Sequence, residues 1–161
     1  MLDDIQKPLM NKLLNSTLTT SSILKRFYSS NEKSQFYWSF WHYLGEMTQP
    51  KRILSVGGDL GLEASCVCRK SEIVLYEAKN PRFATKNVKI SGGTLSNIKS
   101  WDLAIIHSEY CSHLDFIWNG MILDGLICVI NAGSDFQDFA KVKNREPIYF
   151  ELKHVIGVIQ K

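Results

Sequence analysis

At residues 53–61 the chain reads Ile-Leu-Ser-Val-Gly-Gly-Asp-Leu-Gly. The first four residues are mostly apolar and predict a buried strand. The glycines Gly57, Gly58 and Gly61 predict a tight turn, because a residue without a Cβ lets the backbone turn sharply and approach a ligand closely. A helix is expected to begin near Leu62. A strand, a glycine-rich turn and a helix in this order are typical of α/β proteins that bind a nucleotide-like ligand at the helix N-terminus.

Short apolar runs alternate with helical segments along the rest of the chain. Strands are predicted at 73–77, 87–90, 101–107 and 126–131, and helices at 62–69, 109–121 and 135–142. Near-continuous apolar strands separated by helices are typical of a parallel sheet that is covered on both faces. The last two runs, 148–152 and 155–159, predict an antiparallel hairpin that turns near Lys153 and His154.

The first fifty residues have a different character. A helix is predicted over 34–47, with apolar residues at 37, 40, 41 and 44 forming one buried stripe. Phe36, Trp38 and Tyr43 lie off this stripe, so the helix is expected to contact partners on more than one side. We therefore divide the chain into an N-terminal arm with a helix, 1–33, and an α/β domain, 34–161.

Composition and charge exclude several classes of protein. The chain has 161 residues, of which 45% are hydrophobic and 22% charged, as in one soluble globular domain. Seven basic residues against two acids between Arg69 and Lys99 are followed by six acids and no Lys or Arg between Asp102 and Asp138. That acidic stretch would repel a phosphate backbone, so nucleic acid is not expected as a partner.

The location is expected to be intracellular and cytoplasmic. No apolar run approaches the ~20 residues needed to span a bilayer. The N-terminus carries acids where a secretory signal carries positive charge. The four cysteines lie in apolar or helical surroundings, which favours reduced thiols over a disulfide scaffold.

An acidic residue follows the glycine-rich turn at a distance along the chain that suits the binding of a ribose. Glu77 ends the second predicted strand, 20 residues after Gly57. A carboxylate at that point can accept hydrogen bonds from both hydroxyls of a ribose. A dinucleotide is less favoured than a mononucleoside, because the glycine spacing does not match the usual fingerprint and no second mononucleotide-binding half follows.

At this point the sequence resembles the class I S-adenosylmethionine-dependent methyltransferases. Residues 53–64 look like their first motif, 74–77 like their second-strand motif, and 101–107 and 124–131 like their fourth and fifth strands. The resemblance covers roughly residues 36–161. It implies an α/β, Rossmann-like, three-layer fold with a sheet of about seven strands in the order 3-2-1-4-5-7-6, strand 7 being antiparallel. It also implies S-adenosylmethionine as cofactor, held by Ser55, Gly57, Gly58, Asp59, Gly61 and Glu77.

Three positions depart from the family pattern. Ser55 stands where an acid usually organises the loop, and Asp59 replaces the second glycine of the G-x-G-x-G pattern. Thr94 stands where an acid often holds the adenine amino group. In addition, Val88 comes only eleven positions after Glu77, which is short for a crossover helix.

Few residues are candidates for chemistry. His107 and Glu109 follow the fourth strand, at the edge where α/β sheets bind substrates, and a histidine there can serve as a general base toward a hydroxyl. In the metal-dependent O-methyltransferases, acids and an amide after the fourth and fifth strands hold a divalent cation. Here the matching positions carry His107 and Asn131, a poor pair for magnesium, so no metal is expected. The sequence spacing around His42, His113 and His154 does not indicate a catalytic or metal-binding partner for any of them.

Two hypotheses follow. In the first, the chain is a small methyltransferase that acts on a small molecule or a protein side chain. In the second, it is a non-catalytic methyltransferase-like module, a pseudoenzyme that binds a protein partner or a second copy of itself. This second hypothesis uses the aromatic helix 34–47 and the N-terminal arm as the contact surface. Fold alone does not decide between them.

Overall fold

A mixed sheet of seven strands forms the centre of the molecule, in the order β3-β2-β1-β4-β5-β7-β6. The computed structural model describes residues 32–57, 61–67, 71–76, 88–91 and 99–161. The strands are β1 (Arg52–Val56), β2 (Glu72–Tyr76), β3 (Val88–Ser91), β4 (Trp101–His107), β5 (Met121–Ile130), β6 (Ile148–Glu151) and β7 (Val155–Gln160). The first five run parallel, and β7 pairs antiparallel with both β5 and β6. The predicted strand order and the antiparallel strand 7 are confirmed.

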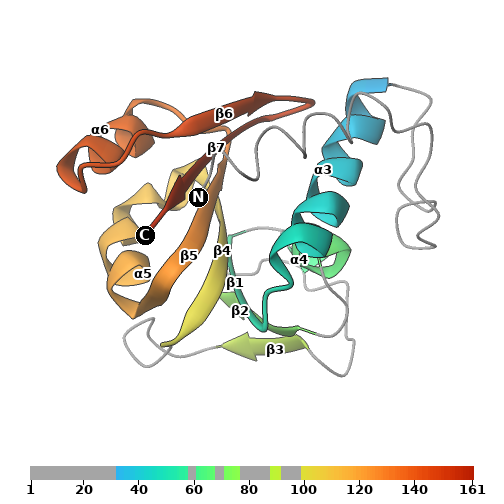
Figure 1. Cartoon of the computed structure of the whole chain (residues 1–161), viewed down its shortest axis with the longest axis horizontal. Helices are drawn as coiled ribbons and strands as arrows, with labels where there is room; N and C mark the ends of the chain where they lie inside the picture. The colour runs from blue at the N-terminus through green and yellow to red at the C-terminus, as the bar shows by residue number, and fades with distance from the viewer. Residues whose placement is uncertain (1–31, 58–60, 68–70, 77–87, 92–98) are drawn as a thin grey trace.

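Helices cover both faces of this sheet. They are α3 (Glu32–Thr48), α4 (Gly61–Val67), the 3-10 helix η2 (Ser108–His113), α5 (Leu114–Gly120) and α6 (Ser134–Val142). Figure 1 shows α3 and α4 on one side of the sheet and α5 and α6 on the other. No helix within these described ranges has the length and apolar character needed to cross a membrane.

Most predicted boundaries agree with the structure within two residues, and two elements differ by more. The helix expected over 109–121 is a 3-10 helix followed by a separate seven-residue α-helix, and Tyr110 within the 3-10 helix has non-helical angles. The fifth strand was expected to begin at 126 but begins at Met121, and its first half is largely exposed. Periodicity missed this extension because residues 122–124 lack the burial that marks a core strand.

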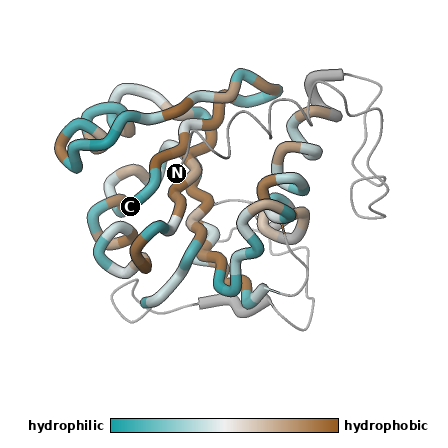
Figure 2. Tube along the Cα trace, in the orientation of Figure 1, coloured by the Kyte–Doolittle hydropathy of each residue, from teal (hydrophilic) through white to brown (hydrophobic). Residues whose placement is uncertain are grey.

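Two hydrophobic cores lie on the two faces of the sheet. On the α3 and α4 side, Phe40, Trp41 and Leu44 pack on strand residues that include Ile53 and Ile105. On the other side, the residues Leu114, Ile117, Phe136 and Ala140 of α5 and α6 pack on Leu54, Val56, Ala104, Ile106, Ile127 and Val129. The strands β1, β2, β4 and β5 thus contribute alternate residues to opposite cores, which is why their buried stretches are mostly apolar. The hydropathy colouring of Figure 2 follows this pattern along the central strands.

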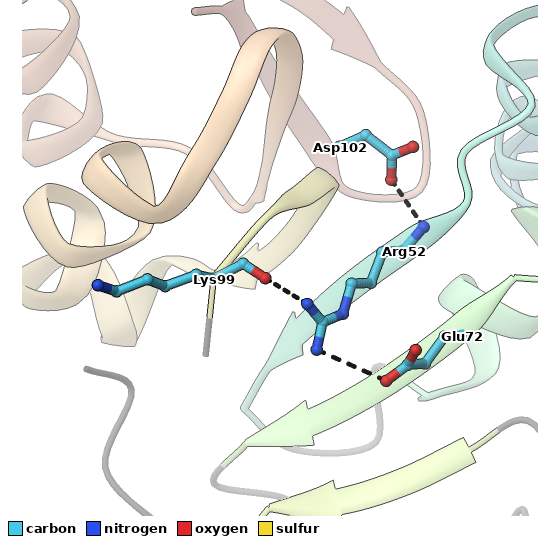
Figure 3. Close-up of polar contacts among 4 residues, drawn as sticks. All are labelled: Arg52, Glu72, Lys99 and Asp102. Carbon is cyan, nitrogen blue, oxygen red and sulfur yellow. Dashed lines mark hydrogen bonds and ion pairs between the residues drawn. The ribbon is translucent and has the colours of Figure 1, made fainter. Parts of the chain in front are cut away.

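The amino ends of β1, β2 and β4 are joined by a polar network (Figure 3). The Asp102 carboxylate accepts hydrogen bonds from the backbone N–H groups of Lys51 at 2.7 Å and Arg52 at 2.8 Å. The Arg52 guanidinium donates to the carbonyl of Lys99 and lies 3.6 Å from a carboxylate oxygen of Glu72. This network aligns the three strands at the edge opposite to the glycine turn.

Candidate functional site

The carboxyl ends of β1, β4 and β5 meet at one edge of the sheet. Since the three strands are parallel and adjacent, the residues that follow them are brought together. Gly57 follows β1, His107 ends β4 and Asn131 follows β5. His107 continues the alternation of Leu103 and Ile105, so its side chain lies on the α3 face of the sheet.

Asn131 bridges two imidazole rings at this edge. Its side-chain amide nitrogen donates to Nε2 of His107 at 3.4 Å. Its side-chain oxygen accepts from Nδ1 of His154 at 3.2 Å. Asn131 itself has a left-handed φ of 58°, a conformation that asparagine tolerates better than most residues. Its backbone N–H donates to the carbonyl of Val155 at 2.8 Å, which ties the end of β5 to the start of β7.

Glu109 completes the group from η2. One of its carboxylate oxygens lies 3.7 Å from Nδ1 of His107, an ion-pair distance that is too long for a hydrogen bond. Nδ1 of His107 is buried and has no hydrogen-bond partner among the described residues. The structure thus brings together the two predicted chemical residues, His107 and Glu109, and adds Asn131 and His154 to them.

His154 was missed by sequence reasoning, although the predicted topology already placed it. A strand that runs antiparallel to β5 begins where β5 ends, and Ile156 of β7 pairs with Ile130 of β5. The turn that precedes β7 must therefore reach the carboxyl edge. The hairpin does turn at Lys153 and His154, as predicted, and is closed by the Leu152 N–H donating to the His154 carbonyl at 3.3 Å.

Ser55 lies near the end of β1, and Gly57 is the first residue of the glycine turn. The Ser55 side chain is 2% exposed, and its hydroxyl has no hydrogen-bond partner in the described part of the chain. A buried polar atom without a partner is costly, and its presence beside the turn is a feature of ligand sites. Gly57 adopts a φ of 95°, which L residues rarely adopt, and its N–H donates to the Tyr76 carbonyl at 2.9 Å.

The ring of Tyr110 packs directly on Gly57. A Cβ at position 57 would lie 2.4 Å from a ring carbon of Tyr110, so only glycine fits under this ring. Tyr110 also stacks on His113 at a centroid distance of 6.2 Å, and His113 contacts the Tyr76 ring at 5.9 Å. This aromatic group covers the ends of β1 and β2 from the α5 side, a contact that local sequence patterns do not indicate.

Thiol chemistry is not expected at this edge. Burial, and to a lesser degree the nearby Asp135 carboxylate, raises the pKa of the Cys111 thiol to about 11. Burial also raises the pKa of Cys128 far above its ordinary value. Both residues are therefore protonated thiols at neutral pH, and neither supplies a thiolate nucleophile.

Several predicted site residues lie outside the described part of the chain. These are Gly58, Asp59, Glu77 and Thr94, and the same holds for most of the N-terminal arm. Gly61 is the first residue of α4, as the predicted turn requires. Within the ranges that are described, no group of three or more His, Cys, Asp or Glu side chains is arranged to hold a metal ion.

Solved structures similar to this chain are methyltransferases. A methyltransferase from Geobacter sulfurreducens has a TM-score of 0.67 at 10% identity, covering 94% of each chain. A Podospora anserina methyltransferase with bound S-adenosylhomocysteine has a TM-score of 0.65 at 13% identity, covering 99% of this chain and 96% of that one. The O-methyltransferase from Bacillus cereus, in complex with S-adenosylhomocysteine, has a TM-score of 0.58 at 11% identity, covering 98% and 91%.

Comparison at the level of sequence finds nothing similar: no protein-family model and no curated protein matches the chain. At identities this low, structural similarity is evidence for the fold alone. The strand order, the antiparallel β7 and the three structural neighbours agree on it: this chain has the class I methyltransferase fold.

Proposed function

We propose that this protein is a small S-adenosylmethionine-dependent methyltransferase whose acceptor, a small molecule or a protein side chain, binds at the carboxyl edge of β4 and β5. The observation that carries the proposal is the Asn131-bridged pair of imidazoles at that edge. Open α/β sheets bind ligands at this edge.

The residues of the glycine turn fit the cofactor. The partnerless, buried Ser55 hydroxyl supplies a hydrogen-bonding group where the family pattern has an acid. Gly57 has no Cβ, so a cofactor could approach its backbone closely. Ser55, Gly57 and Gly61 would hold the cofactor together with Gly58, Asp59 and Glu77. When bound there, S-adenosylmethionine supplies an electrophilic methyl group.

The other residues of the site would orient the methyl acceptor. His107 is the last residue of β4 and Asn131 directly follows β5, and because these strands pair up to His107 and Ile130, both side chains are positioned by the end of the sheet. Such a rigid arrangement holds an acceptor in line with the methyl group, which is the main source of rate in a simple transfer. Glu109, beside His107, favours a proton on Nδ1 of that ring.

Replacing Ser55 with Ala tests the cofactor site. Because the hydroxyl has no partner in the described structure, Ser55→Ala should leave the melting temperature of the free protein unchanged or raise it. The affinity for S-adenosylhomocysteine should fall about tenfold, the loss of roughly one hydrogen bond to a charged group. Differential scanning fluorimetry and calorimetric titration measure the two effects.

The matched control is Ser134→Ala, at the exposed start of α6, which should change neither quantity. If Ser55→Ala lowered the melting temperature and left the affinity unchanged, Ser55 would have a structural role and would be removed from the cofactor site.

One observation favours a second candidate, the non-catalytic module. The Tyr110 ring fills the space over Gly57, so the demand for glycine there is explained without a ligand. Phe116 of α5 and Ile122 and Leu123 of β5 are large apolar residues that are exposed by 58%, 44% and 75%, as residues of a partner surface would be. By contrast, α3 buries Tyr37, Phe40 and Trp41 within its own chain. Failure to bind S-adenosylhomocysteine at millimolar concentration would favour this candidate.

A further inference from the structure

The two imidazoles at the carboxyl edge are both held as Nδ1–H tautomers, but they present different nitrogens to Asn131. The Asn131 amide nitrogen donates a hydrogen bond to Nε2 of His107. The lone pair of His107 Nε2 is therefore occupied, and the proton of the neutral His107 ring is on Nδ1. The Asn131 oxygen accepts from Nδ1 of His154, so His154 carries its proton on Nδ1. It follows that Nε2 of His154 has a free lone pair, and no described residue hydrogen-bonds to it.

The surroundings of His154 keep this ring neutral. Partial burial lowers the pKa of His154 below its ordinary value of 6.5, and the charges of Lys153 and His107 lower it further. From α3, the Tyr37 ring contacts it edge-on at a centroid distance of 5.3 Å. The acidic group of this edge, Glu109, lies beside His107, on the other side of Asn131. At neutral pH the His154 ring is therefore a base that is ready to accept a proton.

Tyr37, the other titratable group in contact with His154, is not available for this role. Its hydroxyl donates to a Glu63 carboxylate oxygen at 2.7 Å. Burial and then the negative charge of Glu63 raise the pKa of Tyr37 far above its ordinary value. Tyr37 thus stays protonated and serves as an apolar wall for the His154 ring.

We infer that His154, rather than His107, is the proton acceptor of the reaction, and that the methyl acceptor is a hydroxyl compound. The inference rests on the proposed function. A hydroxyl is a weak nucleophile that needs a base as the new bond forms, whereas a neutral amine attacks without one. Asn131 and His107 act as positioning residues, because they hold the His154 tautomer without receiving the proton.

The hydroxyl oxygen forms a bond to the methyl carbon, and the carbon–sulfur bond of the sulfonium breaks with its electron pair going to sulfur. The hydroxyl proton passes to Nε2 of His154. The ring becomes an imidazolium whose Nδ1–H stays on the Asn131 oxygen, which stabilises the charge. The proton is later lost to water.

Nitrogen NMR of the full chain tests the tautomer without any substrate. The ¹⁵N shifts of His154 should show the Nδ1–H tautomer in the wild type. In Asn131→Gly, which suits the left-handed backbone and removes the bridging amide, His154 should shift toward the Nε2–H tautomer. An Nε2–H tautomer of His154 in the wild type would overturn the inference.

Kinetics test the role in transfer, with catechol as the hydroxyl probe and benzylamine as the amine probe. His154→Asn keeps a donor for Asn131 but removes Nε2, so kcat for catechol should fall about 100-fold. S-adenosylhomocysteine should bind with unchanged affinity, and kcat of the wild type should rise with pH to a plateau reached below pH 7. The control is His42→Asn on α3, whose ring lies near Glu46 and should be without effect.

Each outcome decides the inference separately from the proposed function. Unchanged kcat in His154→Asn, or transfer to benzylamine and not to catechol, would overturn it. If S-adenosylhomocysteine binds and neither probe is methylated, the NMR result decides the inference: the Nδ1–H tautomer of His154 supports it and the Nε2–H tautomer overturns it. If S-adenosylhomocysteine does not bind, the proposed function fails and the inference that rests on it falls with it, whatever the tautomer.

Discussion

Gly45→Ala is expected to destabilise the protein by about 3 kcal/mol or more, because no space exists for a methyl group between α3 and α4. A Cβ built on Gly45 would lie 1.7 Å from the carbonyl oxygen of Val67 and 2.5 Å from its carbonyl carbon. Both are backbone atoms, so α4 itself would have to move away from α3. In an open helix the same change is favourable by roughly 0.5–1 kcal/mol, and here the steric term outweighs it.

Urea denaturation of the wild type and Gly45→Ala measures this difference. The matched control is Gly133→Ala, where a Cβ meets no atom within 4 Å. It should shift the unfolding midpoint little. An unchanged midpoint in Gly45→Ala would mean that α3 and α4 are not packed as closely as described. This packing matters for the candidate site because α4 begins at Gly61, the last glycine of the turn.

Trp101→Ala has the other large expected effect, a loss of about 3–5 kcal/mol in the free energy of unfolding. Trp101 is 1% exposed at the start of β4 and belongs to the core on the α5 and α6 side. Its indole N–H donates to the Ile117 carbonyl of α5 at 3.0 Å. Truncation leaves a large cavity and also removes the donor from a buried carbonyl.

Trp101→Phe separates the two causes. It retains most of the apolar volume and loses the hydrogen bond, so the cost should fall to about 1–3 kcal/mol. Thermal unfolding followed by circular dichroism measures both variants. Equal losses in Trp101→Ala and Trp101→Phe would contradict the cavity as the main cause.

The fold could be predicted because the buried stretches of its central strands are mostly apolar. Residues 101–107 form β4 with the predicted bounds, since both faces of a central parallel strand are buried. The turn at Lys153 and His154 was also predicted, from two β-rich runs too close together for a crossover. By contrast, the 3-10 turn at Tyr110 could not be predicted, because it depends on packing against Gly57.

The candidate site could be predicted only where its residues follow a strand directly. His107 and Glu109 were found in this way, and they lie together. His154 follows no parallel strand, and its role depends on the pairing of β7 with β5, a contact between segments far apart in the chain. The bridge through Asn131 depends in addition on a left-handed backbone at that residue, which sequence periodicity does not reveal.

Calorimetric titration of the full chain with S-adenosylhomocysteine tests the central claim most directly. We expect one binding site per chain with a dissociation constant in the micromolar range, which corresponds to a binding free energy of about −8 kcal/mol. The Ser55 hydroxyl and the Gly57 turn would contribute to it. No heat of binding at millimolar ligand would contradict the proposed methyltransferase and leave a methyltransferase fold that serves another purpose.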